Sequence, residues 1–150
     1  MKGQTLIEVL VALAIAVVVV TSITILSITS LNNAQFVRDQ EQATKYAQEG
    51  IEVMRALRNS NYAGFAAYNN TYCLGAGRQT LGSPAGDCTP TKIDNKFVRS
   101  VQIQQDGCGT SLSSVVVTVA WNDGKCAGSS LCHSSNNSSC FTTVPPVTGP

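Results

Sequence analysis

The hydrophobic pattern of this chain changes sharply along its length. No charged residue occurs between Val9 and Val37, and Val9–Ile28 is predominantly apolar. A helix of about 20 residues spans roughly 30 Å, which is the thickness of the hydrocarbon core of a bilayer. We therefore predict that residues 4–30 form a membrane-spanning segment of helix.

The pattern becomes one-sided after this apolar stretch. Residues 35–58 are rich in Gln, Glu, Ala, Arg and Lys, which favour helix. Small and apolar residues recur there at spacings of four and three, which places them on one stripe: Ala43, Ala47, Gly50, Met54 and Leu57. Together the two halves predict one helix from about Gln4 to Arg58, in which residues 31–58 are the amphipathic half.

The middle of this predicted helix is its weakest part. Residues 17–30 concentrate β-branched and hydroxyl side chains, which have lower helix propensity than Ala or Leu. We expect any local loosening of the helix to occur there.

The remainder of the chain predicts loops and strands. Gly and Pro punctuate residues 59–96, which is typical of a loop, and Asn122-Asp123-Gly124 is a turn signal. Four runs are expected to be strands, from their β-branched content or alternation: 97–104, 114–121, the weaker 125–133 and a short 140–144. The predicted fold class is α+β, a long helix packed on a small antiparallel sheet, with residues 59–150 as an extracytoplasmic head domain.

Composition and charge favour a chain that works outside the cytoplasm. Only 13% of the residues are charged and 6% are aromatic, so the head domain has a thin core and benefits from covalent cross-links. The formal net charge of +1 leaves no basic surplus for nucleic-acid phosphates. Lys2 precedes the apolar stretch, and the positive-inside rule then places the N-terminus in the cytoplasm and the head domain beyond the inner membrane.

A removable signal peptide is the alternative interpretation of the N-terminal stretch. Small residues at Ala12, Ala14 and Ala16 imitate a cleavage site, but the apolar run continues past them into Val17–Val20. The run is also longer than the roughly 7–15 residues of a signal h-region. We expect single-pass insertion into the inner membrane rather than ordinary signal-peptidase cleavage.

The six cysteines, all between Cys73 and Cys140, predict three disulfides. The chain has no C-x-x-C pair, so a zinc site is disfavoured, and no metal or other cofactor is expected. Cys73–Cys88 is the firmest pairing, because it closes the Gly-rich part of the loop. Two patterns remain open for the other four cysteines: Cys132–Cys140 with Cys108–Cys126, or Cys108–Cys132 with Cys126–Cys140.

No catalytic constellation accompanies these features, and we do not expect an enzyme. His133 is the only histidine, and its polar neighbours in the sequence favour a solvated side chain. Glu8 is the one charge that requires an explanation, because a carboxylate inside a membrane helix costs about 2.5–3.5 kcal/mol on insertion scales. A capping box, with Thr5 as the N-cap and Glu8 three residues later, is one explanation.

The N-terminal residues resemble a known family. Gly3-Gln4-Thr5-Leu6-Ile7-Glu8, followed by the apolar run, is similar to the prepilin motif of type IV pilins and pseudopilins. Tyr46–Arg58 is similar to the helix of PilV-like minor pilins. The resemblance covers residues 1 to about 58, and it implies the pilin architecture of a long helix packed on an antiparallel sheet.

The resemblance also implies how the chain is processed and assembled. Residues 1–3 would be a leader peptide, removed by prepilin peptidase after Gly3, and Gln4 would then be N-methylated. The family usually has Phe or another apolar residue where Gln4 stands, which concerns methylation more than cleavage. Glu8 would pair with the new amine of Gln4, on its own chain or on a neighbouring subunit. The implied partners are other pilin subunits, prepilin peptidase and an inner-membrane assembly platform.

The function implied by the resemblance is that of a structural, minor subunit of a type IV pilus or related filament. The subunit would lie in the inner membrane before assembly, and in an extracellular pilus or a periplasmic pseudopilus afterwards. Two alternatives remain open. One is a pseudopilin of a type II secretion system, and the other is a pilus-tip adhesin or DNA-binding minor pilin whose head contacts a surface or DNA ligand.

Overall fold

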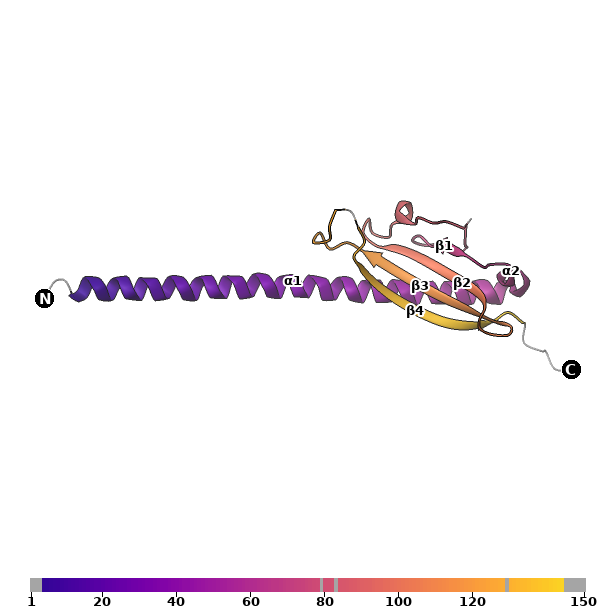
Figure 1. Ribbon diagram of the computed structural model, residues 1–150, viewed down its shortest axis with the longest axis horizontal. Coiled ribbons are helices and arrows are strands. Elements are labelled where there is room, and N and C mark those ends of the chain that lie inside the picture. Colours follow the sequence, from indigo (N-terminus) through magenta and orange to yellow (C-terminus); the bar gives the residue numbers. More distant parts are fainter. Residues whose placement is uncertain (1–3, 79, 83, 129, 145–150) are drawn as a thin grey trace. The chain divides into compact units, whose positions relative to one another are not determined.

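The computed structural model describes residues 4–78, 80–82, 84–128 and 130–144. The chain divides into two compact units, residues 1–39 and 40–150, which are treated separately below. Its elements, labelled in Figure 1, follow one another in this order: α1 Gln4–Ser60, α2 Tyr62–Ala66, β1 Thr71–Cys73, the 3-10 turn η1 Thr89–Thr91, β2 Val98–Gly109, β3 Leu112–Trp121 and β4 His133–Thr142. The predicted helix of about Gln4 to Arg58 is confirmed.

The strands form one antiparallel sheet in the order β1-β2-β3-β4. Val117 of β3 lies opposite Val101 of β2 on one side and Asn137 of β4 on the other. The register between β2 and β3 shifts between Gln104 and Gly109, next to the turn that joins the two strands. Figure 1 shows this sheet alongside the C-terminal part of α1.

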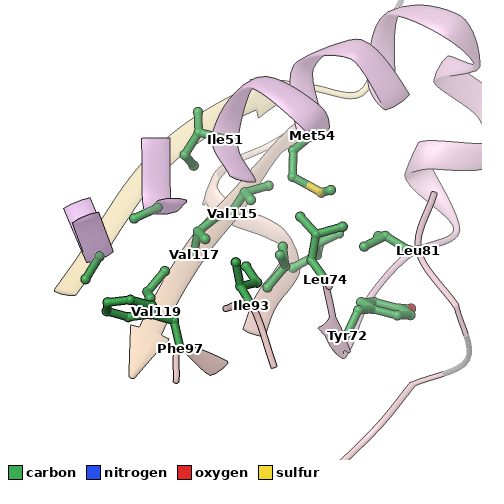
Figure 2. Packing of buried hydrophobic residues seen from close by; sticks show 14 of the residues in the cluster. Ile51, Met54, Tyr72, Leu74, Leu81, Ile93, Phe97, Val115, Val117 and Val119 are labelled. Atoms are coloured by element: carbon green, nitrogen blue, oxygen red, sulfur yellow. The ribbon is translucent and has the colours of Figure 1, made fainter. Parts of the chain in front are cut away.

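The core lies between the sheet and the stripe on α1 that the sequence predicts. Ala43, Ala47 and Met54 are buried, with exposed fractions of 0–1%. Figure 2 shows Ile51 and Met54 of the helix on the side of Val115 and Val117 of β3. Gly50 allows the closest approach, because a Cβ atom there would lie 2.7 Å from Cγ1 of Val117. A small residue at this position lets helix and strand pack without a clash.

The two strongest strand predictions, 97–104 and 114–121, correspond to β2 and β3, except that Phe97 precedes the first residue of β2. The third prediction, at 125–133, is wrong, because most of that segment is loop. The strand that follows is β4, and it includes the Ser/Asn-rich run 134–139, for which no strand was predicted. Polar residues tolerate this position because β4 is an edge strand on which only Phe141 is buried. Pairing with β3 along the full length of β4 outweighs the weak strand preference of Ser and Asn.

Three disulfides cross-link the second unit. Cys73–Cys88 joins β1 to the following loop, which is the pairing expected from the sequence. The other two are Cys108–Cys140 and Cys126–Cys132, so both patterns considered for these four cysteines are wrong. Cys132 and Cys140 lie near opposite ends of the extended strand β4. At about 3.3 Å per residue they are too far apart to bond to each other.

Candidate functional site

The N-terminal turn of α1 carries the residues to which processing and assembly were assigned. Gly3, the predicted cleavage position, lies outside the described residues. Gln4 is the first residue of α1, and Glu8 follows it on the same helix with an exposed side chain. Four residues make about one helical turn, so the backbone nitrogen of Gln4 and the Glu8 carboxylate belong to adjacent turns. Cleavage after Gly3, methylation of Gln4 and the pairing of Glu8 stay predictions.

The apolar side chains of the first unit have no cover from within the unit. Every large apolar residue from Leu6 to Val37 is exposed, with exposed fractions from 39% at Phe36 to 69% at Leu26. Among the described residues, one helix, Leu6–Ser60, is long and apolar enough to cross a membrane by its length and composition. An apolar surface of this extent indicates contact with lipid or with other proteins.

Hydroxyl side chains in this part of α1 are satisfied by the helix itself. Five hydroxyls donate hydrogen bonds of 2.7–3.0 Å to the carbonyl oxygen four residues earlier: those of Thr21, Ser22, Thr24, Ser27 and Thr29. Each of these five hydroxyl donors therefore has a hydrogen-bond partner within the helix, which suits a helix in lipid. The segment that the sequence marks as weakest is helical throughout in the structure.

A shallow apolar depression interrupts the surface of this segment. It is lined by residues on one face of the helix: Leu13, Ala16, Val17, Val20 and Thr21. Their spacings of three and four are those of neighbours on a helix surface. A small residue such as Ala16 permits close approach of another helix, which is how helices associate in lipid.

In the second unit, a buried arginine joins the helix to the sheet and to the loop after β1. Arg99 of β2 is fully buried, and its guanidinium donates hydrogen bonds of 3.0 Å to the carbonyl oxygens of Tyr46, Leu74 and Gly75. Its Nη1 also lies 3.4 Å from Oε2 of Glu49 on α1. Burial lowers the pKa of Arg99, and the charge of Glu49 opposes that shift. The contacts identify Arg99 as a structural clamp rather than a binding group.

Tyr46 adds a second tie between α1 and the same loop. Its hydroxyl donates a hydrogen bond to the carboxylate of Asp94, and its ring lies edge-on to Phe97 at 5.4 Å between centroids. The hydrogen bond to Asp94 raises the pKa of the Tyr46 hydroxyl above its ordinary value. The helix half from Gln40 onward is therefore fixed to the head by polar as well as apolar contacts.

Two neighbouring rows of side chains on the outward side of the sheet contain no charged residue. Neighbours across the three long strands are Gln102, Val116 and Ser138 in one row, and Ser100, Thr118 and Asn136 in the next. Neither row contains Lys or Arg, the residues that neutralise phosphate charge.

A cluster of potential metal ligands lies where β3 ends and β4 begins. Its members are Asp123, Cys126, Cys132 and His133, whose ligand atoms all lie within 4.8 Å of one another. The expectation of a solvated His133 is wrong, because Nε2 of His133 lies 3.2 Å from Oδ2 of Asp123 and the imidazole lies beside the Trp121 ring, at 5.5 Å between centroids. The backbone N–H of Lys125, and then His133, hold the pKa of Asp123 below its ordinary value.

Sequence reasoning missed this cluster because its ligands are not paired in a C-x-x-C motif. The Asn-Asp-Gly turn signal placed Asp123 after a strand, and Cys132 is adjacent to His133 in the sequence. What brings them together is the β3–β4 register, in which Trp121 lies opposite His133. That register could be foreseen only by recognising the Ser/Asn-rich segment as a strand.

Comparison with known proteins adds one finding to this geometry. Residues 1–24 match the family model of the prokaryotic N-terminal methylation motif, which is the signature of type IV pilins and pseudopilins. No curated protein and no solved structure matched the chain. The chain thus combines that signature with a pilin-like α+β fold and three disulfides. The motif is typical of structural, membrane-anchored pilin-like or pseudopilin proteins, which in general are processed by prepilin peptidase and assemble with other pilin subunits.

Proposed function

We propose that this chain is a minor structural subunit of a type IV pilus or related filament. Prepilin peptidase cleaves it after Gly3, Gln4 is N-methylated, and the mature subunit enters the filament through the N-terminal half of α1. One observation carries the proposal: the N-terminal methylation motif leads directly into a helix whose apolar residues are uncovered from Leu6 to Val37.

An uncovered apolar helix has two uses in such a subunit. Before assembly it lies in the inner membrane, where its side chains contact lipid. During assembly it exchanges lipid for the helices of neighbouring subunits. Lipid tails are as apolar as Leu or Val, so this exchange gains little from the hydrophobic effect and depends on close packing and polar contacts. The depression around Ala16 offers the packing, and Glu8 offers the polar contact.

Glu8 acts in this account by choosing the position of the incoming subunit. Cleavage after Gly3 creates a positively charged amine on Gln4, next to lipid. A buried charge without a partner is strongly unfavourable, whereas an ion pair in the same place is tolerated. Pairing of Glu8 with the Gln4 amine of a neighbour therefore fixes the axial stagger of two subunits. The inner-membrane assembly platform supplies the site at which this pairing occurs.

The head features favour a structural role over DNA capture. The two central rows on the outward side of the sheet contain no charged residue, so this part of the face offers no cation to neutralise DNA phosphates. The similarity of Tyr46–Arg58 to the helix of minor pilins favours a minor subunit over a major one.

The proposal predicts a specific defect for Glu8→Gln. The variant keeps the shape of the side chain and can still fill a capping-box position, but it removes the charge. We expect normal cleavage and membrane insertion, together with at least a tenfold loss of the subunit from sheared filaments. Co-purification with sheared filaments is the measurement, since a minor subunit need not polymerise alone. Glu41→Gln is the matched control, because Glu41 is exposed on the same helix and pairs with Lys45 in its own chain.

The outcomes separate the remaining alternatives. Wild-type incorporation of Glu8→Gln would reduce Glu8 to a local helix cap and contradict the assembly role. Loss of both variants alike would indicate a general effect of charge on the helix. If removal of the chain abolishes secretion of an exoprotein while surface filaments persist, the subunit belongs to a type II secretion pseudopilus instead.

A further inference from the structure

We propose that Asp123, Cys126, Cys132 and His133 form a thiol-dependent Zn²⁺ site that is mutually exclusive with the Cys126–Cys132 disulfide. The four residues supply two sulfurs, one imidazole nitrogen and one carboxylate oxygen. This donor set matches zinc, which binds Cys, His and Asp in four-coordinate tetrahedral sites. The proposal goes beyond filament assembly and does not depend on it.

The spacing of the donor atoms already approaches that of a zinc site. Tetrahedral bonds of about 2.0–2.3 Å place ligand atoms about 3.3–3.8 Å apart. Nε2 of His133 lies 3.2 Å from Oδ2 of Asp123, and Sγ of Cys126 lies 3.7 Å from Oδ1, the other oxygen of the same carboxylate. All four ligand atoms lie within 4.8 Å of one another. Only the two bonded sulfurs must move apart, and reduction of the disulfide releases them.

The scaffold around the site does not rely on the disulfide. Nδ2 of Asn122 donates hydrogen bonds to the carbonyl oxygens of Gly128 and Ser130, at 3.3 and 2.8 Å, across the loop that contains Cys126. Oδ1 of Asn122 accepts a 2.6 Å bond from the N–H of Gly124. Two further anchors come from the neighbouring backbone.

These anchors fix the remaining ligands. Oδ1 of Asp123 accepts a 2.9 Å bond from the N–H of Lys125, and β3–β4 pairing places His133 opposite the buried Trp121. The disulfide also closes the shortest of the three cross-linked loops, with a sequence separation of 6. Opening it therefore returns the least chain freedom of the three. Asp123 and His133 should keep their positions when the thiols form.

Neighbouring metal-binding side chains distinguish Cys126–Cys132 from the other two disulfides. Neither Cys73–Cys88 nor Cys108–Cys140 belongs to a cluster of three or more metal-binding side chains among the described residues. The thiols of Cys126 and Cys132 are thus the pair that zinc would recognise.

The chemistry balances as two steps. A dithiol reductant breaks the S–S bond of Cys126–Cys132 with two electrons and two protons, giving two thiols and the oxidised, cyclic disulfide of the reductant. Zn²⁺ then binds both sulfurs as thiolates and releases two protons to solvent, with neutral His133 and ionised Asp123 completing the site. Reoxidation by a disulfide oxidant reverses the sequence and expels the metal. A newly made chain starts with the thiols and needs only the second step.

The test uses the full chain in detergent micelles, with Zn²⁺ as the probe. Oxidised protein and protein reduced with a dithiol, then freed of reductant without air, are titrated against a chromophoric zinc chelator. We expect about one Zn²⁺ per reduced chain and none for the oxidised chain. Trp121 is the only tryptophan and lies beside His133, so its fluorescence should change on zinc binding in reduced protein alone. This optical signal reports on the site itself.

Variants assign the ligands. Cys126→Ser with Cys132→Ser should abolish zinc binding, whereas the matched pair Cys108→Ser with Cys140→Ser should retain it. His133→Ala should weaken binding at least tenfold, and Asp123→Asn should weaken it less. Far-UV circular dichroism checks that each double variant is folded. A second measurement needs no variant and follows reoxidation of the reduced wild-type chain with and without zinc. Zinc should slow reoxidation of Cys126–Cys132 by at least tenfold but not that of Cys73–Cys88.

Several results would overturn the proposal. Equal zinc binding by oxidised and reduced chain would show that the thiols are not ligands. Retention of zinc by the Cys126/Cys132 variant, or unchanged affinity in His133→Ala, would place the metal elsewhere. Equal protection of all three cysteine pairs would indicate non-specific thiol binding.

Discussion

The two units of this chain solve the problem of apolar surface in opposite ways. In the first, residues such as Val18 are 63% exposed, and the described part of the unit offers them no cover. In the second, Val117 of β3 is fully buried in the core that the sheet forms with α1. The same residue type is thus placed for external partners in one unit and for an internal core in the other. The single helix α1 therefore has two separate roles.

The sequence encodes this division through periodicity. Apolar residues surround the helix on all sides in the first unit, so no single face is selected. After Gln40 they contract to a stripe that includes Ala43, Ala47 and Met54, and the opposite face becomes charged. A stripe can be satisfied by one sheet, whereas an all-round apolar surface requires lipid or several neighbouring helices.

Removal of disulfides should affect the second unit most strongly and the first not at all. Replacement of Cys108 and Cys140 by Ser removes a cross-link with a sequence separation of 32, and the chain-entropy model predicts a loss of about 3.5–4 kcal/mol in the free energy of unfolding. The same change at Cys126 and Cys132, with a separation of 6, should cost about 2.2 kcal/mol. Urea unfolding in micelles, followed by Trp121 fluorescence, measures both.

The control for this prediction is membrane insertion of the same variants. Extraction from membranes by alkaline carbonate should stay unchanged, because the first unit contains no cysteine. If the shorter loop contributes as much as the longer one, chain entropy is not the main contribution of these cross-links.

A matched pair of valines tests the comparison directly. Val117→Ala removes buried methyl groups from the core, and we expect a loss of about 2 kcal/mol in the free energy of unfolding of the head. Val18→Ala, at an exposed position of α1, should change that free energy by less than about 0.5 kcal/mol. Both are measured by the same urea unfolding. An effect of Val18→Ala as large as that of Val117→Ala would mean that the head depends on packing in the first unit.

Acid should produce the smallest effect, confined to the second unit. The folded-state pKa of Asp123 is lowered, chiefly by the N–H of Lys125. A lowered pKa means that the carboxylate stabilises the fold above its unfolded pKa of about 3.9, and that this contribution is lost as pH falls through the folded-state value. Asp123→Asn should therefore be less stable than wild type at pH 7, and the difference should shrink as pH falls through the folded-state pKa of Asp123. A difference that persists unchanged in acid would exclude ionisation as its cause.

The helix α1 and the strands β2 and β3 could be predicted from the sequence, because local patterns of apolar residues determine them. The apolar run and the stripe define α1, and β-branched runs define β2 and β3 because those strands alternate between core and surface. Most of β4 escaped prediction, because its Ser/Asn-rich sequence has no apolar alternation apart from Phe141; only its end, residues 140–142, lies in the short strand predicted at 140–144. Its position is determined by long-range pairing with β3, which no local signal reveals.

The failure at β4 accounts for the other errors. Two disulfides were mispaired because residues 134–139, between Cys132 and Cys140, were not recognised as part of a strand. His133 was taken as solvated because its partner Asp123 is brought near only by the β3–β4 register. The assembly residues differ in kind: Gly3, Gln4 and Glu8 are identified by a contiguous motif, which requires no knowledge of the fold.

The decisive measurement for the pilin proposal is the intact mass of the chain, made with and without prepilin peptidase. Co-expression with the peptidase should remove residues 1–3, leave Gln4 as the N-terminus and add the mass of one methyl group. Substitution of Gly3 should block the change. A mature protein that begins after Ala14 or Ala16, or a chain whose mass is the same with and without the peptidase, would contradict the proposal that this helix is the assembly element of a pilin-like subunit.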